Sequence, residues 1–444
     1  MEKLSVFWFR RDLRLEDNAG LYHALKGRSP VIPLFIFDTN ILDKLSDRSD
    51  ARVNFIWNEI RRIKQELKSI SSDLIVRIGA PLEIFKELTI LYNLQAVYTN
   101  HDFESYGIER DHLVNDYLKE QNIGFYTYKD HVIFEKEEVV KDDGKPYTVF
   151  TPYAKKWKIK LNSKIDKQDN QLSYYLKSYP SEKYFDNFKK FKSDQLPTLK
   201  SLGFCYTTIE LPGTVVQSSL IKNYEANRNF PAIQGTSKLG IHFRFGTISI
   251  REKARKAMPL SETFINELIW RDFYAQILYH FPYVEKGPFR QEYDRIEWIN
   301  NPKDFEKWCE GKTGYPIVDA GMRELNATGF MHNRVRMITA SFLTKHLLID
   351  WRWGEQYFAE KLLDFDLASN NGGWQWAAGC GTDAAPYFRI FSPDAQTTKF
   401  DKDKIYIKQW VPDYNSTTYP KPMVDHSFAR TRCLEIYKTA LKSF

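Results

Sequence analysis

Cysteine is scarce in this chain. Only four occur among its 444 residues (Cys205, Cys309, Cys380 and Cys433), and no two of them form a CxxC pair. This spacing indicates neither a structural zinc site nor a disulfide framework, so we predict no metal ligand set. A chain without paired cysteines is typical of a reducing compartment, and we expect a cytoplasmic protein.

Long apolar runs are also missing. No segment reaches the roughly 18 consecutive apolar residues that a transmembrane helix needs. The first residues, MEKLSVFWFRRDLR, contain no apolar stretch that ends in a small-residue cleavage site. We therefore expect neither a membrane association nor a secretion signal. The GxGxxG fingerprint is absent after the first apolar segment, which argues against a dinucleotide site there.

Aromatic residues and positive charge, in contrast, are abundant. Aromatic residues make up 15% of the chain and include 11 tryptophans, and the formal net charge is +7. A basic balance is typical of proteins that bind polyanions. A large aromatic core under a Lys-rich surface gives the same composition, so composition leaves both interpretations open.

The first third of the chain alternates strand and helix patterns. Segments 4–9, 31–37, 74–78, 96–100 and 125–130 resemble buried strands, and segments 51–70, 81–94 and 105–121 resemble helices. Within 51–70, helical spacing places Phe55, Ile56, Ile60, Ile63 and Leu67 on one face. The alternation predicts a Rossmann-like, parallel five-stranded sheet with helices on both faces, which forms an α/β domain over residues 1–134.

The remaining chain has a different character. Residues 135–215 are rich in Lys, Ser, Asn, Asp and Pro, which predicts a partly helical connector between domains. From 216 to 444 helical patterns dominate, so we predict an all-α C-terminal domain.

Two helical segments in that domain carry polar residues at regular spacing. Segment 261–280 begins with Ser261 as a candidate N-cap, and Glu267, Trp270 and Arg271 share one of its faces. An ion pair packed on an aromatic ring explains this triplet as well as a binding site does.

Segment 328–355 is predicted to be a second single helix. Asn333 and Met337 lie on one face of it, and the helical pattern points Arg334 and Arg336 elsewhere. His332 has no metal-binding partner at ligand spacing, so we do not predict that it binds a metal.

Two shorter motifs suggest ligand contacts without defining them. The turn GTSKLG (235–240) presents backbone N–H groups that can bind a phosphate, although such turns are also ordinary helix starts. In DFDLASNNGG (364–373), Asp364, Asp366 and Asn370 are close in sequence. Their spacing is compatible with magnesium, with an arginine partner or with a sugar hydroxyl.

Five stretches together resemble one family. "WFRRDLRLEDN", "TSKLG", "NELIWRDFY", "MHNRVRM" and "DFDLASNNGGWQWAAGCGTDAAPYFRIFSP" are similar to motifs of the photolyase/cryptochrome family, most closely to class I cyclobutane pyrimidine dimer photolyases. The resemblance extends from about residue 4 to 441 and is weakest between 135 and 215. It implies an antenna-binding N-terminal domain, a helical FAD-binding domain and a monomeric carbon–carbon lyase that repairs UV-damaged DNA with light.

The resemblance also implies how the chemistry works. Reduced, anionic FAD absorbs light and donates one electron to the flipped dimer, whose cyclobutane ring splits before the electron returns. The implied FAD contacts are Tyr224, Thr236, Ser237, Lys238, Leu239, Gly240, Arg336, Asp364, Phe365, Asp366 and Asn370. Among them, Asp364 pairs with Arg336 beside the flavin, and Asn370 faces its N5 atom. Gly240 lacks the hydroxyl that the family often has at that position.

Further roles follow from the same resemblance. The residues implied in catalysis are Glu267, Trp270, Asn333, Met337, Asn370 and Trp376. Glu267 would stay protonated to donate to a thymine carbonyl, and Trp270 and Trp376 would stack on the flipped bases. The implied DNA contacts are Arg228, Glu267, Trp270, Arg271, Asn333, Arg334, Arg389 and Gln396. Trp374, Trp351 and Trp298 match an electron relay to oxidised flavin, for which core packing is the alternative.

Three other functions within the family are less compatible with the sequence. A (6-4) photolyase typically has a histidine pair where this chain has Met331-His332-Asn333. A signalling cryptochrome commonly has a long C-terminal extension, and plant-type sensors have Asp where this chain has Asn370. A protein that has lost catalysis is not expected to retain Glu267, Asn333 and Met337.

The antenna chromophore stays open between a deazaflavin, a folate, another flavin and none. Members of the family that bind a folate have a carboxylate near position 107 and a second contact near 285. This chain has Gly107 and Glu285 at those positions.

Overall fold

The computed structural model describes residues 2–163, 165–166 and 172–442, and its contacts divide them into two compact units. Unit 1 comprises residues 1–139, 156–214 and 239–258, and unit 2 comprises 140–155, 215–238 and 259–444. The predicted connector 135–215 is therefore shared between the units. Its later part is fixed to unit 1 by hydrogen bonds, such as those from Trp57 Nε1 to the Pro197 carbonyl (2.7 Å) and from Asn54 Nδ2 to the Cys205 carbonyl (3.0 Å).

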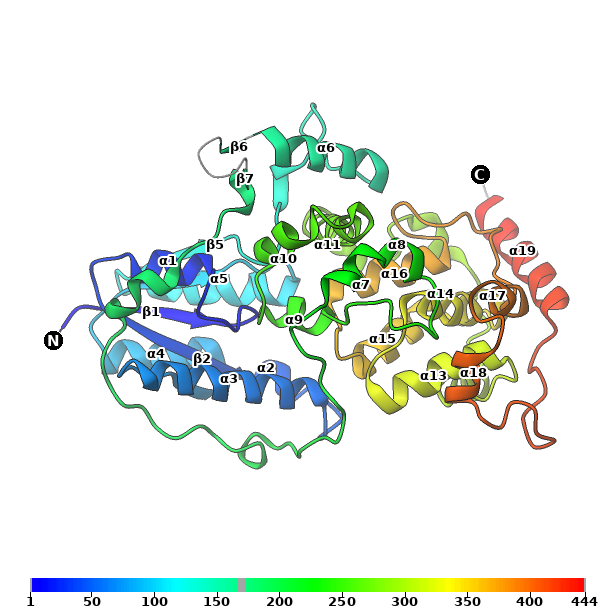
Figure 1. Cartoon of the computed structure of the whole chain (residues 1–444), viewed down its shortest axis with the longest axis horizontal. Helices are drawn as coiled ribbons and strands as arrows, with labels where there is room; N and C mark the ends of the chain where they lie inside the picture. Colours follow the sequence, from blue (N-terminus) through cyan, green and yellow to red (C-terminus); the bar gives the residue numbers. More distant parts are fainter. Residues whose placement is uncertain (1, 164, 167–171, 443–444) are drawn as a thin grey trace. The chain divides into compact units, whose positions relative to one another are not determined.

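Unit 1 is built on a five-stranded parallel sheet of order β3-β2-β1-β4-β5. The strands are β1 (Leu4–Phe9), β2 (Val31–Asp38), β3 (Ile75–Gly79), β4 (Leu94–Asn100) and β5 (Gly124–Tyr128). The helices between them are α1 (Ala19–Leu25), α2 (Thr39–Leu42), α3 (Ala51–Ser69), α4 (Pro81–Leu91) and α5 (Ser105–Glu120) (Figure 1). The predicted α/β fold is confirmed.

The remaining elements of unit 1 are short. They are η1 (Lys136–Glu138), β6 (Ile165–Asp166), β7 (Leu172–Ser173), η2 (Tyr174–Leu176), η3 (Ser181–Asn187), η4 (Lys200–Leu202), α9 (Gly240–Phe245) and α10 (Ile250–Ala257). Helix α6 (Phe150–Ser163) begins in unit 2 and ends in unit 1.

The apolar core of unit 1 lies between the sheet and helices α4 and α5. Alternate residues of β1 (Leu4, Val6 and Trp8) pack there against Phe85 of α4 and Leu118 of α5, and all five side chains are buried. Because side chains alternate along a strand, the other residues of β1 face the opposite side of the sheet.

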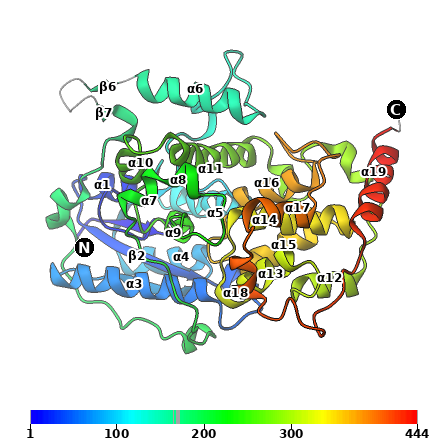
Figure 2. The same cartoon turned by 45° about the vertical axis from the view of Figure 1, so that its right-hand side comes forward.

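Unit 2 is helical, as predicted. Its elements are α7 (Ser218–Lys222), α8 (Tyr224–Asn227), α11 (Glu262–His280), η5 (Pro282–Glu285), η6 (Gln291–Arg295), α12 (Pro302–Cys309), α13 (Pro316–Thr328), α14 (Asn333–Ser341), the π-helical turn η7 (Phe342–His346), α15 (Trp351–Lys361), α16 (Leu367–Ala378), α17 (Pro393–Phe400), α18 (Ile405–Trp410) and α19 (His426–Lys442). Helix α16 packs against α11, α14 and α15 (Figures 1 and 2).

The prediction of one helix over 328–355 is wrong. Gly329 has a positive φ of 67° and ends α13, so a new helix begins only at Asn333, where His332 Nδ1 accepts from Arg334 N at 3.1 Å. That helix ends in η7, and Leu348 then adopts a left-handed φ of 49°. The carboxylate of Asp350 caps α15. The apolar spacing continues across these breaks because the segments on both sides of each break are helical. The spacing alone therefore did not reveal the caps and the π-turn that separate the helices.

Within the described part of the chain, no helix combines the length and the apolar character that crossing a bilayer requires.

Candidate active site

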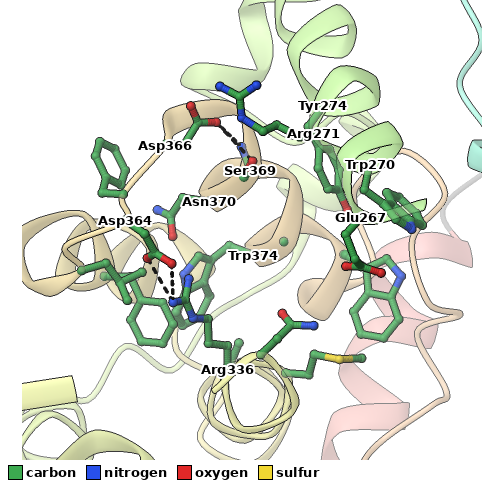
Figure 3. A pocket seen from close by; sticks show the side chains of 18 of the residues that line it. Glu267, Trp270, Arg271, Tyr274, Arg336, Asp364, Asp366, Ser369, Asn370 and Trp374 are labelled. Carbon is green, nitrogen blue, oxygen red and sulfur yellow. Dashed lines mark hydrogen bonds and ion pairs between the residues drawn. The ribbon is translucent and has the colours of Figure 1, made fainter. Parts of the chain in front are cut away.

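A cavity of about 470 Å³ opens in unit 2 where α11, α14 and α16 meet (Figure 3). Its size is in the range of small-molecule sites, which are typically about 300–1,000 Å³. Its lining comprises Arg228, Glu267, Trp270, Arg271, Tyr274, Asn333, Arg336, Met337, Ala340, Phe358, Leu362, Asp364, Phe365, Asp366, Ser369, Asn370, Gly373, Trp374 and Trp376. The cavity thus brings together residues that are up to 148 positions apart in the sequence (228 to 376).

The glycine pair of α16 allows that helix to approach α11. A Cβ atom on Gly372 would overlap the ring of Tyr274, whereas one on Gly373 would meet nothing within 4 Å. Gly372 therefore sets the contact between the two helices. Gly373 lines the cavity and leaves its space open.

The predicted ion pair between Arg336 and Asp364 is present in this cavity. Arg336 Nη2 donates to both carboxylate oxygens of Asp364 at 3.0 and 2.9 Å, and its Nε donates to the Met331 carbonyl at 2.7 Å. Both side chains are about one-fifth exposed, so one side of the pair is open. The helical pattern had pointed Arg336 away from Asn333, but residues three apart on a helix are neighbours, and both line the cavity.

Asp366 and Asn370 occupy the first turn of α16. The Asp366 carboxylate caps the helix by accepting from Ser369 N at 3.2 Å and Ser369 Oγ at 3.1 Å. The Asn370 amide nitrogen donates to the Glu355 carbonyl at 3.1 Å, so its amide oxygen is the atom left for a ligand. Among the described residues no cluster of three or more His, Cys, Asp or Glu is placed to hold a metal ion.

Glu267 faces the same cavity from α11 and forms an ion pair with Arg228. The sequence alternative had paired Glu267 with Arg271, its neighbour on the helix. Burial raises the pKa of the Glu267 carboxyl, and the positive charge of Arg228 partly opposes this shift. In Figure 3 the carboxylate lies near Trp270, on the side of the cavity opposite Asp364.

The two tryptophans predicted to stack on bases both line the cavity. Trp270 is stacked on Phe150, with ring centroids 3.7 Å apart and ring planes 2° from parallel. Trp376 has a looser, tilted contact with Phe391 at 6.4 Å. Phe150 was not found by sequence reasoning, because a stacking contact between positions 120 residues apart leaves no local pattern.

Three of the predicted DNA-contacting arginines are close to one another. Burial lowers the pKa of Arg334, and the positive charges of Arg228 and Arg389 lower it further. Arg334 Nη2 donates to Asn229 Oδ1 at 2.7 Å, and its guanidinium lies 4.3 Å from the ring centre of Phe400. The repulsion among these cations would be relieved by an anion.

Two neighbouring polar groups complete this region. The amide oxygen of Gln396, on α17, is buried and has no hydrogen-bond partner among the described residues. Burial and nearby cations, Arg336 first, lower the pKa of His332 to about 4, so His332 is neutral near pH 7.

The three relay tryptophans belong to one apolar cluster of unit 2. Trp374 and Trp351 are buried, and Trp298 packs against the same cluster. A Cβ on Gly354 would overlap Trp374, so this glycine lets the Trp374 indole lie against α15, whose first residue is Trp351. The ring contacts of Trp374 are with Trp308 (6.0 Å) and Phe358 (4.9 Å).

The predicted phosphate-binding turn lies outside the cavity lining. Lys238 has a left-handed φ of 52°, and its Nζ lies 4.8 Å from the ring centre of Phe330. Thr236, Ser237 and Lys238 belong to unit 2, whereas Leu239 and Gly240 belong to unit 1. Tyr224 starts α8, and burial raises its pKa to about 12. The roles of these residues in FAD binding stay predictions.

The sequence left the antenna chromophore open, and Gly107 supplies no carboxylate for a folate. Gly107 is buried, and a Cβ there would lie 2.5 Å from the carboxyl carbon of Asp102, so no carboxylate side chain fits at this position. At the point where the strand order reverses, Arg10 follows β1 and donates to the carbonyl of Asn100, the last residue of β4. Its guanidinium also pairs with Asp111.

Comparison with known proteins gives consistent results over the whole chain. The family model described as DNA photolyase matches residues 5–171, and the one described as FAD binding domain of DNA photolyase matches residues 264–418. The chain is 36% identical to the deoxyribodipyrimidine photo-lyase of Alkalihalophilus pseudofirmus, and the match covers 98% of each chain.

Solved structures give the same result. A bacterial class III photolyase from Agrobacterium tumefaciens superposes with a TM-score of 0.87 at 29% identity, covering 100% of this chain and 98% of the other. The archaeal photolyase from Sulfolobus tokodaii, whose structure contains two FAD molecules, has a TM-score of 0.83 at 33% identity and covers 98% of this chain and 100% of its own.

Proposed function

Because the chain belongs to the DNA photolyase family, we propose that its unit 2 cavity holds FAD and receives a cyclobutane pyrimidine dimer beside it. The enzyme is a light-dependent DNA repair enzyme, a deoxyribodipyrimidine photo-lyase with FAD as cofactor. The identity of any antenna chromophore stays open, and Gly107 lacks the carboxylate that folate-binding members of the family have near this position.

The observation that carries the proposal is that one cavity has polar groups on two opposite sides and apolar residues in the same lining. Arg336, Asp364 and Asn370 form a polar end, and Glu267, Asn333 and Met337 lie on the α11 and α14 walls. Phe358, Leu362 and Trp374 add apolar surface to the lining of the same cavity. A mostly apolar cavity with a few convergent polar groups suits a planar heteroaromatic ligand.

When bound, reduced FAD supplies the light-driven, one-electron donor for the ring-splitting reaction. The protein's part is to bind and orient. Arg336 and Asp364 present a donor and an acceptor from one fixed, paired unit, which suits the alternating donor and acceptor edge of a flavin. The amide oxygen of Asn370 can accept from a ring N–H, which favours the reduced form.

On the other side of the cavity, we assign Glu267 the role of holding a proton for a thymine carbonyl. A carboxyl group can donate a hydrogen bond only when it is protonated, and burial favours that form. A donor aimed at the carbonyl stabilises negative charge as the electron arrives. Trp270 and Trp376 offer aromatic faces to the two bases, as is usual for unpaired nucleotides.

The cluster of Arg228, Arg334 and Arg389 supports DNA as the partner, because clustered cations attract phosphates. The test is repair by the purified, reduced enzyme under blue light. One oligonucleotide carries a cyclobutane thymine dimer, and a matched one carries a (6-4) photoproduct. We expect repair of the first only and only in light. Repair of the second, or of neither, would contradict the proposal.

A further inference from the structure

Trp270 has only one ring face available to the cavity, because Phe150 covers the other. The two rings are 3.7 Å apart and 2° from parallel, so nothing can enter between them. Trp270 lines the cavity and Phe150 does not. A base that stacks on Trp270 must therefore use the face that is turned to the cavity.

Phe150 is held in place by its backbone and not only by its ring. Its N–H donates to Asp383 Oδ2 at 3.2 Å. Two residues earlier, the carbonyl of Thr148 accepts from the hydroxyl of Thr382. The carbonyl of Tyr147 accepts from the buried amide of Gln276 on α11 at 2.9 Å. One of these three hydrogen bonds ties the segment to α11, the helix that carries Trp270, and the other two tie it to the residues that follow α16.

The orientation of Trp270 is restrained from further sides. Phe273 of the same helix meets the rings of both Phe150 and Trp270 nearly at right angles, at 5.9 and 5.6 Å. Tyr274 lies 5.4 Å from Trp270 on the cavity side. With its indole plane fixed before DNA arrives, Trp270 does not lose conformational freedom when a base stacks on it, and this preorganisation raises affinity.

We infer that Phe150 is a positioning residue for the flipped dimer, which it serves by fixing the plane of Trp270 and blocking its outer face. This inference rests on the proposed function, since it assigns Trp270 to the dimer. Phe150 is neither part of the cavity lining nor one of the predicted FAD contacts. Its loss should therefore affect dimer recognition and leave FAD binding unchanged.

The experiment compares Phe150→Leu, Phe150→Tyr and wild type as full-length, FAD-loaded enzymes. The Kd is measured for a dimer-containing oligonucleotide and for the same undamaged sequence. An aromatic pair contributes an amount equivalent to about a two- to tenfold change in affinity, so we expect Phe150→Leu to raise the Kd for dimer DNA by that factor. The Kd for undamaged DNA, the flavin content and the repair yield per absorbed photon at saturating DNA should not change.

Phe150→Tyr keeps the ring and should restore dimer affinity to the wild-type value. Phe428→Leu is a matched control, because Phe428 is an exposed phenylalanine on α19 that packs under Arg432 and is not part of the cavity lining. We expect wild-type Kd values for this variant.

Two results would overturn the inference. One is an unchanged selectivity for dimer over undamaged DNA in Phe150→Leu. The other is a parallel loss of flavin and of both affinities, which would indicate a merely structural role. If Phe150→Leu does not fold, Phe150→Met replaces it under the same criteria. If wild type repairs dimers and Phe150→Leu keeps the wild-type selectivity, only this inference fails. An inactive wild type would refute the proposed function itself.

Discussion

At the scale of residues, the site depends on two ion pairs between a carboxylate and a guanidinium group. Arg336 and Asp364 share two hydrogen bonds at the polar end of the cavity, and Arg228 pairs with Glu267 at the other. None of these pairs could be identified by spacing alone, because the partners are 28 and 39 positions apart. The resemblance suggested the first pair, and for Glu267 an ion pair with Arg271 on the same helix was the alternative to a binding role.

The Arg336–Asp364 pair provides the first prediction. In Asp364→Ala, Arg336 loses its carboxylate, and a hydrogen bond to a charged group contributes about 1.5–3 kcal/mol. We expect FAD affinity to fall by about ten- to hundredfold, measured by flavin fluorescence titration of the apoprotein. Asp413→Ala is the control, because it breaks an exposed ion pair of the same unit, with Arg323. Equal flavin affinity in wild type and Asp364→Ala would show that the pair does not contact FAD.

The second prediction concerns protons. The charge of Arg228 holds the pKa of Glu267 below the value that burial alone would give. If Arg228 pairs with a DNA phosphate on binding and leaves Glu267, the pKa of Glu267 rises further and its carboxyl takes up a proton. Affinity for dimer DNA is then highest at pH values below the pKa that Glu267 has in the DNA-free enzyme. The affinity weakens by up to about tenfold per pH unit between the pKa of Glu267 in the DNA-free enzyme and its higher pKa in the DNA complex.

The measurement is the Kd for dimer DNA as a function of pH, together with proton uptake by calorimetry in buffers of different ionisation enthalpy. Glu267→Gln should bind with no pH dependence from this group. In Arg228→Ala, Glu267 lacks its cationic partner even without DNA, so its pKa in the free enzyme is already raised. The loss of DNA affinity should therefore begin at a higher pH than in wild type. His332, with a pKa of about 4, does not titrate between pH 6 and 9. Wild-type binding without proton uptake would contradict the assignment.

At the scale of elements, alternation and caps made much of the fold predictable. The five strands were predicted to within about two residues at each end, and Ser261 caps α11 by accepting from Phe264 N at 3.2 Å. The predicted buried face of α3 is correct for Phe55, Ile60, Ile63 and Leu67, whereas Ile56 is only half-buried. The break between α14 and α15 was missed because Leu348 adopts a left-handed conformation that its side chain does not favour.

Helices α15 and α16 together provide the third prediction, on the electron relay. Trp351→Phe keeps an aromatic side chain but raises the energy of the radical cation, so we expect it to abolish photoreduction of oxidised FAD. Repair should persist when the flavin is reduced chemically beforehand. The measurement is flavin absorbance during blue illumination with an external reductant.

The matched control for the relay is Trp308→Phe. Trp308 is fully buried and contacts Trp374, but it is not one of the predicted relay residues. We expect photoreduction in this variant. If Trp308→Phe blocks photoreduction and Trp351→Phe does not, the electron that refills Trp374 comes from Trp308 and the predicted relay is wrong.

At the scale of the whole molecule, the charge balance is consistent with the site. The net charge of +7 indicated a polyanion without showing where it binds, and the structure places Arg228, Arg334 and Arg389 close together in unit 2. Which residues converge on a cavity depends on how α11, α14 and α16 pack, and periodicity does not specify that.

The fourth prediction follows from this charge. Affinity for DNA should fall as salt rises, since each cation–phosphate contact releases a counterion. Arg334→Ala should weaken damaged and undamaged DNA alike and reduce the slope of log K against log salt by about one. Arg430→Ala, at an exposed arginine on α19, is the control and should retain the wild-type slope. A wild-type affinity that is independent of salt would contradict a phosphate contact.

The central claim is that FAD and the dimer share the unit 2 cavity and that Glu267 assists the reaction there. The most direct test is the repair yield per absorbed photon at saturating dimer DNA, for wild type and Glu267→Ala with equal flavin content. Saturation removes any effect on affinity, so the yield reports only what happens to a bound dimer. We predict a lower yield in Glu267→Ala, because no proton donor then stabilises the electron on the dimer. An unchanged yield would contradict this account and leave Glu267 as a structural partner of Arg228.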